Sequence, residues 1–240
     1  MTRRHRLWRA CVAEFLGTGM LTLAVVGSGI AATSLSADAG VQLAINAAAT
    51  GLALYVIITV FAPVSGAHLN TVVSLVDAVF GGRPWRHLAG YLPAQFVGGI
   101  LGVVLANTIF GRSPVSISTA DRYSSAHLAA EIVATAGLVL VIFTLSRGAA
   151  HKNVSVAVAA YIAAAYFFTS STSFANPAVT IGRIFTDSFA GISPISALAF
   201  LPAQVVGALI GIAATVLLSP SRQVASTSRA DQTLEDERAV

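Results

Sequence analysis

Residues 171–183, STSFANPAVTIGR, interrupt two long apolar stretches with a polar run, an Asn-Pro-Ala triplet and a closing arginine. A partial repeat, VSGAHLNTVVSLVD at residues 64–77, lies 106 positions earlier when the two asparagines are aligned (176 − 70). Each segment opens with loop-forming residues and is too short to cross a bilayer, which takes about 20 apolar helical residues. Non-helical backbone is tolerated at membrane depth only inside protein or beside water. We therefore predict two re-entrant loops that each return as a half-helix.

The rest of the 240-residue chain has the composition of an integral membrane protein. Hydrophobic residues make up 55% and charged residues 10%, whereas a soluble domain carries about 25% charged residues. The net charge of +4 does not indicate a nucleic acid partner, because the basic residues flank apolar spans and form no single face. Six stretches are predicted to span the bilayer: residues 10–32, 43–62, 88–110, 126–145, 154–170 and 195–218.

The distribution of arginine and lysine predicts the orientation. With the N-terminus inside, eleven basic residues are cytoplasmic and three are outside, which favours cytoplasmic termini in a multi-pass protein of the cell (inner) membrane. The eleven are Arg3, Arg4, Arg6, Arg9, Arg83, Arg86, Arg147, Lys152, Arg222, Arg229 and Arg238, and the three are Arg112, Arg122 and Arg183. Residues 1–9 then form a cytoplasmic N-terminus, and the polar residues 219–240 a disordered cytoplasmic tail.

The chain contains an internal duplication. LPAQFVGGILG (92–102) matches LPAQVVGALIG (201–211) at seven of eleven positions, and AEFLGT (13–18) matches AEIVAT (130–135) in the same order. Each half, about residues 10–110 and 126–218, holds three predicted spans. Because three is odd, the second half enters from the opposite side, which gives an inverted repeat.

The inversion brings the two half-helices together near the midplane, N-terminus to N-terminus. Asn70 and Asn176 are predicted at the N-caps, where the side-chain oxygen accepts an orphan amide, and Pro177 fits the first helical position. Each asparagine then keeps its NH2 group free to donate into the gap. Two donors and two positive dipole ends suit the oxygen of water or of a neutral hydroxylated solute, and they oppose cations.

These motifs resemble those of the aquaporin, or major intrinsic protein, family over roughly residues 10–218. AEFLGT, SGAHLN, AEIVAT, FANPAVT and the paired LPAQ stretches carry the resemblance. It implies an all-α fold of six transmembrane helices and two re-entrant half-helices, a homotetramer in the lipid bilayer with one pore per subunit, and passive conduction of small neutral solutes. It implies no cofactor and no covalent chemistry. No second histidine or cysteine lies at ligand spacing from His68, and no nucleophile, base and orienting group cluster in the sequence, so we expect neither a metal site nor an enzyme.

The sequence keeps both asparagines but departs from the family pattern in the residues that follow them. The first motif reads Asn70, Thr71, Val72, whereas the second keeps Asn176, Pro177, Ala178. The family's usual arginine after the second motif is replaced by Val179. Counting from the asparagines without gaps places the outer constriction at Thr50, Ala164, Ser173 and Val179, all uncharged. We therefore expect a wide ring that passes water, glycerol-like polyols, urea and metalloid hydroxides such as arsenous acid.

Several polar residues have two readings. Glu14 and Glu131 occupy equivalent positions and are expected to support the re-entrant loops, with a proton relay as the alternative. His68 is expected to support its loop, with a pH gate as the alternative. Arg183 either supplies a cation at the outer mouth or reaches the interface, which is the favoured reading. Asp77 is expected to pair with Arg83 or Arg86.

Two other functions fit the sequence less well. A secondary active transporter also uses inverted repeats and broken helices, but its coupling would need midplane carboxylates, and Glu14 and Glu131 are already assigned. A non-conducting adhesion or scaffold protein of the same fold is the third candidate. The one cysteine, Cys11, lies far from Ser173, where some relatives carry a mercury-sensitive cysteine, so we expect mercurials not to block conduction.

Overall fold

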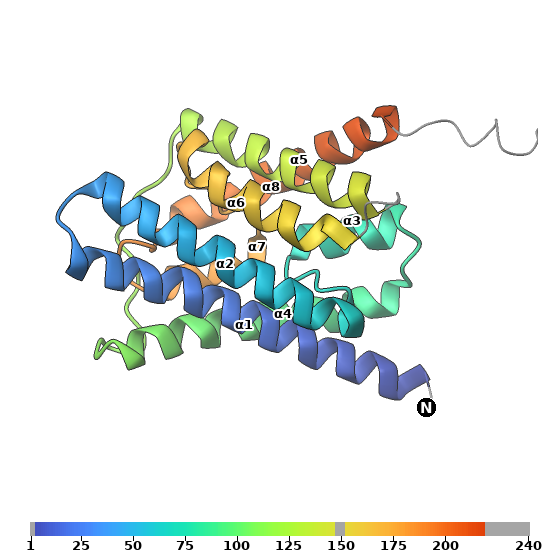
Figure 1. The fold of residues 1–240 in the computed structure, drawn as a ribbon, viewed down its shortest axis with the longest axis horizontal. Coiled ribbons are helices and arrows are strands. Elements are labelled where there is room, and N and C mark those ends of the chain that lie inside the picture. Colours follow the sequence, from blue (N-terminus) through green and yellow to red (C-terminus); the bar gives the residue numbers. More distant parts are fainter. Residues whose placement is uncertain (1–2, 147–151, 219–240) are drawn as a thin grey trace, which may run out of the picture.

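The computed structural model describes residues 3–146 and 152–218, and this part of the chain is folded into helices joined by loops (Figure 1). The helices are α1 (Arg3–Leu35), α2 (Ala39–Ser65), α3 (Thr71–Phe80), α4 (Trp85–Ile109), α5 (Ser125–Ser146), α6 (Val154–Phe168), α7 (Pro177–Gly182), the 3-10 turn η2 (Arg183–Phe185) and α8 (Pro194–Leu218).

All six stretches predicted to span the bilayer are helical. Within the described residues, α1, α2, α4, α5 and α8 are long and apolar enough to cross a membrane. With 15 residues, α6 extends about 22 Å, which is less than the roughly 30 Å of a hydrocarbon core. The helix α1 begins at Arg3, so residues 3–9 of the expected N-terminal segment continue the first span. The expected tail, 219–240, lies outside the described residues.

The two halves repeat one packing scheme, in which α1 packs on α4 and α5 packs on α8. Small residues let these helices approach closely, because a Cβ atom on any of four glycines would overlap a carbonyl oxygen of the facing helix. The close pairs are Gly98 with Phe15, Gly102 with Gly19, Gly207 with Ile132, and Gly211 with Ala136.

The half-helices α3 and α7 lie inside the bundle. They contact each other, and each also contacts α4 and α8 (Figure 1). The second is the shorter, with six α-helical residues followed by η2, against ten residues in α3. The start of α1, the end of α8 and helix α3 lie at the same end of the bundle (Figure 1), as expected if the second half enters from the opposite side.

Candidate functional site

The two re-entrant loops meet at Asn70 and Asn176, which cap α3 and α7. The side-chain oxygen of Asn70 accepts from Val72 N at 3.0 Å, and that of Asn176 accepts from Ala178 N at 3.1 Å. Their amide groups cross over: Asn70 Nδ2 donates to Ala175 O at 2.7 Å, and Asn176 Nδ2 donates to the carbonyl of the opposite loop at 2.6 Å. An amide has two N–H groups, so the expectation of a wholly free NH2 is wrong, and one N–H of each asparagine remains.

Both loops reach this meeting point through the same unusual backbone. Residues at matched positions before each asparagine have positive φ, where non-glycine side chains are strained. The matched pairs are Gly66 (93°) with Thr172 (61°), Ala67 (48°) with Ser173 (52°), and Leu69 (52°) with Ala175 (47°). Such strain persists only where surrounding contacts hold it.

A buried glutamate holds each loop in this conformation. Glu14 is fully buried and accepts from His68 N, Leu69 N and the hydroxyl of Ser65, at 3.0, 2.6 and 2.6 Å. It also accepts from Gln95 Nε2 at 2.8 Å. These contacts are those of a loop support, and they leave the carboxylate no free face for a transport cycle.

Glu131 repeats the arrangement in the second half. It is fully buried and accepts from Phe174 N and Ala175 N, both at 2.9 Å, and from Gln204 Nε2 at 2.7 Å. The glutamines sit 109 positions apart (204 − 95) in the paired LPAQ stretches. The duplication therefore supplies two copies of one device, in which a carboxylate and a glutamine fix a strained loop.

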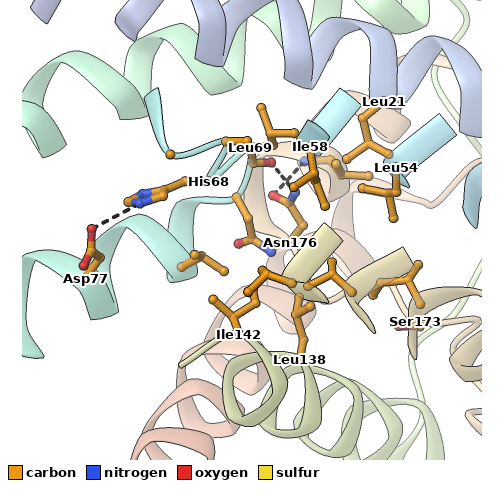
Figure 2. A pocket seen from close by; sticks show the side chains of 18 of the residues that line it. Leu21, Leu54, Ile58, His68, Leu69, Asp77, Leu138, Ile142, Ser173 and Asn176 are labelled. Carbon is orange, nitrogen blue, oxygen red and sulfur yellow. Dashed lines mark hydrogen bonds and ion pairs between the residues drawn. The ribbon is translucent and has the colours of Figure 1, made fainter. Parts of the chain in front are cut away.

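The asparagines line one cavity of about 980 Å³. Figure 2 shows Asn176 and Leu69 between the His68–Asp77 pair on one side and Ser173 on the other. The cavity wall extends from residues near the end of α3 to residues near the end of α7, which we call the Asp77 end and the Arg183 end. Between them the wall is mostly apolar: Leu21, Leu54, Ile58, Leu138 and Ile142.

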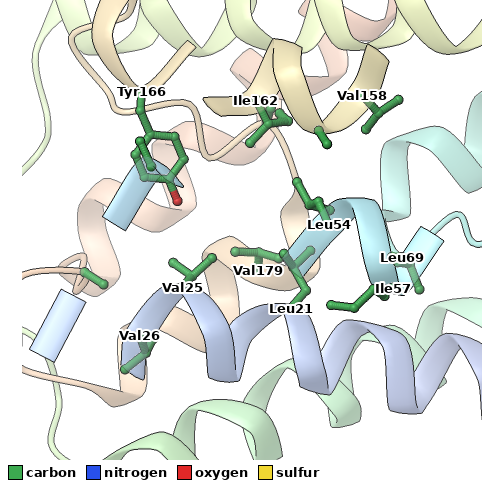
Figure 3. Packing of buried hydrophobic residues seen from close by; sticks show 14 of the residues in the cluster. Leu21, Val25, Val26, Leu54, Ile57, Leu69, Val158, Ile162, Tyr166 and Val179 are labelled. Atoms are coloured by element: carbon green, nitrogen blue, oxygen red, sulfur yellow. The ribbon is translucent and has the colours of Figure 1, made fainter. Parts of the chain in front are cut away.

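Three of the four residues expected at the outer constriction line this cavity, namely Thr50, Ser173 and Val179. The fourth, Ala164, is exposed on the outside of α6 and does not line the cavity. Tyr166 lies there in its place, with its hydroxyl 3.2 Å from Thr50 Oγ1, and its ring points toward the gap between Val25 and Val179 (Figure 3). Ala164 and Tyr166 are two residues apart, which corresponds to a rotation of about 200° around the helix axis. Because Tyr166 faces the cavity, Ala164 faces away from it, and the assignment of Ala164 to the constriction is wrong.

Arg183 also corrects the sequence-based reading. It is 2% exposed and lines the cavity, so it does not reach toward the interface as the favoured interpretation predicted. Its Nε donates to the carbonyl of Ala190, and its guanidinium carbon lies 3.5 Å from the centroid of the Phe174 ring. The Arg183 end therefore has a cation and an aromatic side chain, and the expectation of an uncharged ring is wrong.

The Asp77 end is polar in a different way. Asp77 accepts from Arg83 Nε and contacts His68 Nε2 at 3.1 Å. The Nδ1 atom of His68 lies 3.0 Å from Ser74 Oγ, and the imidazole meets Tyr91 edge-on, with ring centroids 5.4 Å apart. The pairing of Asp77 with Arg83 follows the prediction. Tyr91 and Tyr166 were missed, because an apolar helix gives no sign of which tyrosine faces inward.

Comparison with known proteins identifies the family. The family model described as "Major intrinsic protein" matches residues 1–152. Aquaglyceroporin AqpS of Rhizobium meliloti (strain 1021) is 46% identical over 220 residues, which cover 91% of this chain and 94% of AqpS. The chain belongs to the major intrinsic protein family. It is thus a multi-pass membrane protein, and the resemblance stated from the motifs is confirmed.

Two further comparisons are consistent with membership of the major intrinsic protein family. The glycerol uptake facilitator protein of Streptococcus pneumoniae (strain ATCC BAA-255 / R6) is 33% identical over 150 residues, which cover 55% of this chain and 62% of that protein. The X-ray structure of the aquaglyceroporin from Plasmodium falciparum superimposes with a TM-score of 0.63 at 20% identity, covering 88% of this chain and 93% of that one. The structural match confirms the predicted fold of this family member.

Proposed function

We propose that this protein is a passive channel for small neutral solutes: water, glycerol-like polyols and metalloid hydroxides such as arsenous acid. One observation carries the proposal. Asn70 and Asn176 cap opposed half-helices, donate across to each other's loops, and line a single cavity of about 980 Å³. Their remaining N–H groups are donors for a passing oxygen atom.

The chemistry of the wall favours neutral cargo. Moving an ion out of water costs far more than moving a hydroxyl group, unless the wall supplies paired charges and hydrogen bonds. The middle of this cavity offers two amide groups among aliphatic side chains. A hydroxylated molecule can exchange water for these donors and lay its carbon atoms on the apolar residues.

The names of two relatives support polyols as cargo. AqpS is called an aquaglyceroporin and the streptococcal relative a glycerol uptake facilitator. The buried carboxylates that a coupled transporter would need, Glu14 and Glu131, are held by three or more donors each. We further propose an inner-membrane homotetramer with cytoplasmic termini, which puts the Asp77 end inside and the Arg183 end outside.

Flux through proteoliposomes tests the proposal. Vesicles with the wild-type chain should pass water, glycerol and arsenous acid faster than protein-free vesicles, with no dependence on a proton or sodium gradient. Flux that follows either gradient would indicate a secondary transporter, and no flux at all would indicate a non-conducting member of the family.

A substitution at Val179 tests which residues set the cargo. Val179→Arg adds a bulky cation to the cavity wall, so glycerol and arsenous acid flux should fall more than water flux, because lining donors and pore diameter set selectivity. Val179→Leu is the matched control that adds bulk without charge. Equal loss of all three fluxes, or none, would remove Val179 from the constriction.

A further inference from the structure

Arg183 is a buried cation in the cavity wall. Its side chain is fixed from two directions, by the carbonyl of Ala190 and by the face of the Phe174 ring. Among residues 3–146 and 152–218, no carboxylate comes within 4 Å of it. A buried charge is costly unless it is paired or hydrogen-bonded. The remaining N–H groups of the guanidinium can therefore be hydrogen-bonded by molecules in the cavity.

Ser173 supplies a second incomplete group beside it. The residue is 4% exposed and lines the cavity, and its Oγ has no hydrogen-bond partner in the described part of the chain. Ser173 directly precedes Phe174, the residue on which the guanidinium stacks. A buried hydroxyl without a partner is unfavourable, so an oxygen atom from the cavity is its natural partner.

The remaining wall at this end combines apolar and hydroxyl groups. Val25 and Val179 contribute methyl groups, and Figure 3 shows them facing the gap below Tyr166. Thr50 and Tyr166 form a hydroxyl pair that retains capacity for a further hydrogen bond. The groups on this wall match a molecule with several oxygens and an aliphatic or otherwise apolar face.

We propose that Arg183 is the specificity-determining cation of this channel, and that Arg183 and Ser173 together bind the oxygen atoms of a small neutral polyhydroxylated solute while excluding cations. This inference rests on the proposed function. It places the cation of the constriction four residues, or about one helical turn, beyond Val179. The sequence analysis gave this role of Arg183 as the alternative to the favoured reading. Arg183 follows the end of α7.

The guanidinium suits this role for two reasons. It is planar and rigid and always charged, and the N–H groups left after Nε binds Ala190 can reach two neighbouring oxygens at once. Its charge also acts in a narrow, low-dielectric passage, where repulsion of a cation is much stronger than in water. Uncharged hydroxylated molecules gain hydrogen bonds there, whereas potassium ions and protons meet a barrier.

Four variants in proteoliposomes test the assignment. Arg183→Met keeps the length but removes charge and donors, and it should lower the ratio of glycerol to water flux about tenfold, the effect of one charge-assisted hydrogen bond. It should also admit potassium ions, measured by dye-detected leak. Arg183→Lys should remain impermeable to potassium ions, because it keeps the charge. Its ratio of glycerol to water flux should still be lowered, because the lysine ammonium lacks the planar arrangement of N–H groups of a guanidinium. Ser173→Ala should lower the glycerol ratio alone.

Arg112→Gln is the matched control. Arg112 is an exposed arginine near the same end that bonds to a backbone carbonyl and does not line the main cavity, so its loss should change neither measurement. Should Arg183→Met fail to purify as a folded protein, Arg183→Lys and Ser173→Ala decide the question, and wild-type glycerol ratios in both would overturn the assignment.

The outcomes separate this inference from the function on which it rests. Wild-type vesicles without water or glycerol flux would overturn the proposed channel itself. Wild-type flux together with an Arg183→Met variant that stays potassium-tight at the wild-type glycerol ratio would overturn only the role of Arg183.

Discussion

The two ends of the cavity are built on one template and carry different chemistry. At the Asp77 end, the residue two before the asparagine, His68, contacts the residue seven after it, Asp77. At the Arg183 end, the same two positions hold Phe174 and Arg183, which are also in contact. The ring of Tyr91 in α4 meets His68 edge-on, and the ring of Phe200 in α8 meets Phe174 edge-on. The ring centroids are 5.4 Å apart in both pairs.

This difference shows where the duplicated halves have diverged. The glutamates, the asparagine caps and the positive-φ loops are the same in both, because each is needed to hold a strained loop. The contacting pair is free to change. At one end it is a carboxylate met by an arginine and a histidine, and at the other it is an arginine without a carboxylate. The ends therefore share a scaffold, and the proposed selectivity depends on the Arg183 end, whose charge is uncompensated.

The largest expected effect tests the shared scaffold. Removing either carboxylate, by Glu14→Ala or Glu131→Ala, leaves two backbone amides of a strained loop without an acceptor. At about 1–3 kcal/mol for each unsatisfied group, the free energy of unfolding should fall by roughly 2–6 kcal/mol in both variants. Unfolding of the purified protein in detergent, followed by circular dichroism against denaturant, measures the loss.

The matched comparison is glutamine at the same positions. A glutamine keeps one acceptor oxygen, so Glu14→Gln and Glu131→Gln should lie between wild type and the alanine variants. Wild-type stability in one alanine variant and a large loss in the other would contradict the view that the two loops are held in the same way.

An intermediate effect tests which residues face the passage at the Arg183 end. In a Cys11→Ser background, Ser173→Cys places a thiol on the cavity wall, and mercuric chloride should block most of the water flux, reversibly with a thiol reagent. Ala164→Cys in the same background is the control, since Ala164 faces away from the cavity. Block of the Ala164→Cys variant without block of the Ser173→Cys variant would restore the rejected assignment of the constriction.

The sequence predicts the site residues that belong to the repeated motifs. It does not predict the residues whose position depends on the rotation of a helix about its axis or on contacts with distant parts of the chain. Asn70, Asn176, Glu14 and Glu131 were found from recurring motifs, because capping and loop support depend on residue type and spacing. Ala164 was misplaced because counting without gaps does not fix the rotation of α6 about its axis.

The favoured prediction for Arg183 was wrong for a different reason. Its inward position depends on the carbonyl of Ala190 and the ring of Phe174, which are brought to it by the loops after η2 and before α7. No local pattern around residue 183 reports either contact, so the general tendency of arginine to reach an interface gave the wrong expectation.

The smallest expected effect concerns the first helical residue after each cap, which is Thr71 in α3 and Pro177 in α7. Asn70 already has the extended backbone that a residue before proline adopts, with φ −152° and ψ 125°, and position 71 is the first helical residue, where the N–H is an orphan.

Thr71→Pro removes a long hydrogen bond of 3.3 Å to Gln95 and restricts the unfolded chain, which is worth about 0.4–1 kcal/mol. The free energy of unfolding should therefore change by less than about 1 kcal/mol, with water and glycerol fluxes unchanged. Pro177→Thr is the reciprocal variant. The free energy of unfolding should again change by less than about 1 kcal/mol, with the opposite sign to the change in Thr71→Pro. A shift in the glycerol ratio in Thr71→Pro would mean that the threonine hydroxyl itself takes part in selection, and that the two ends differ at the midplane as well as at their mouths.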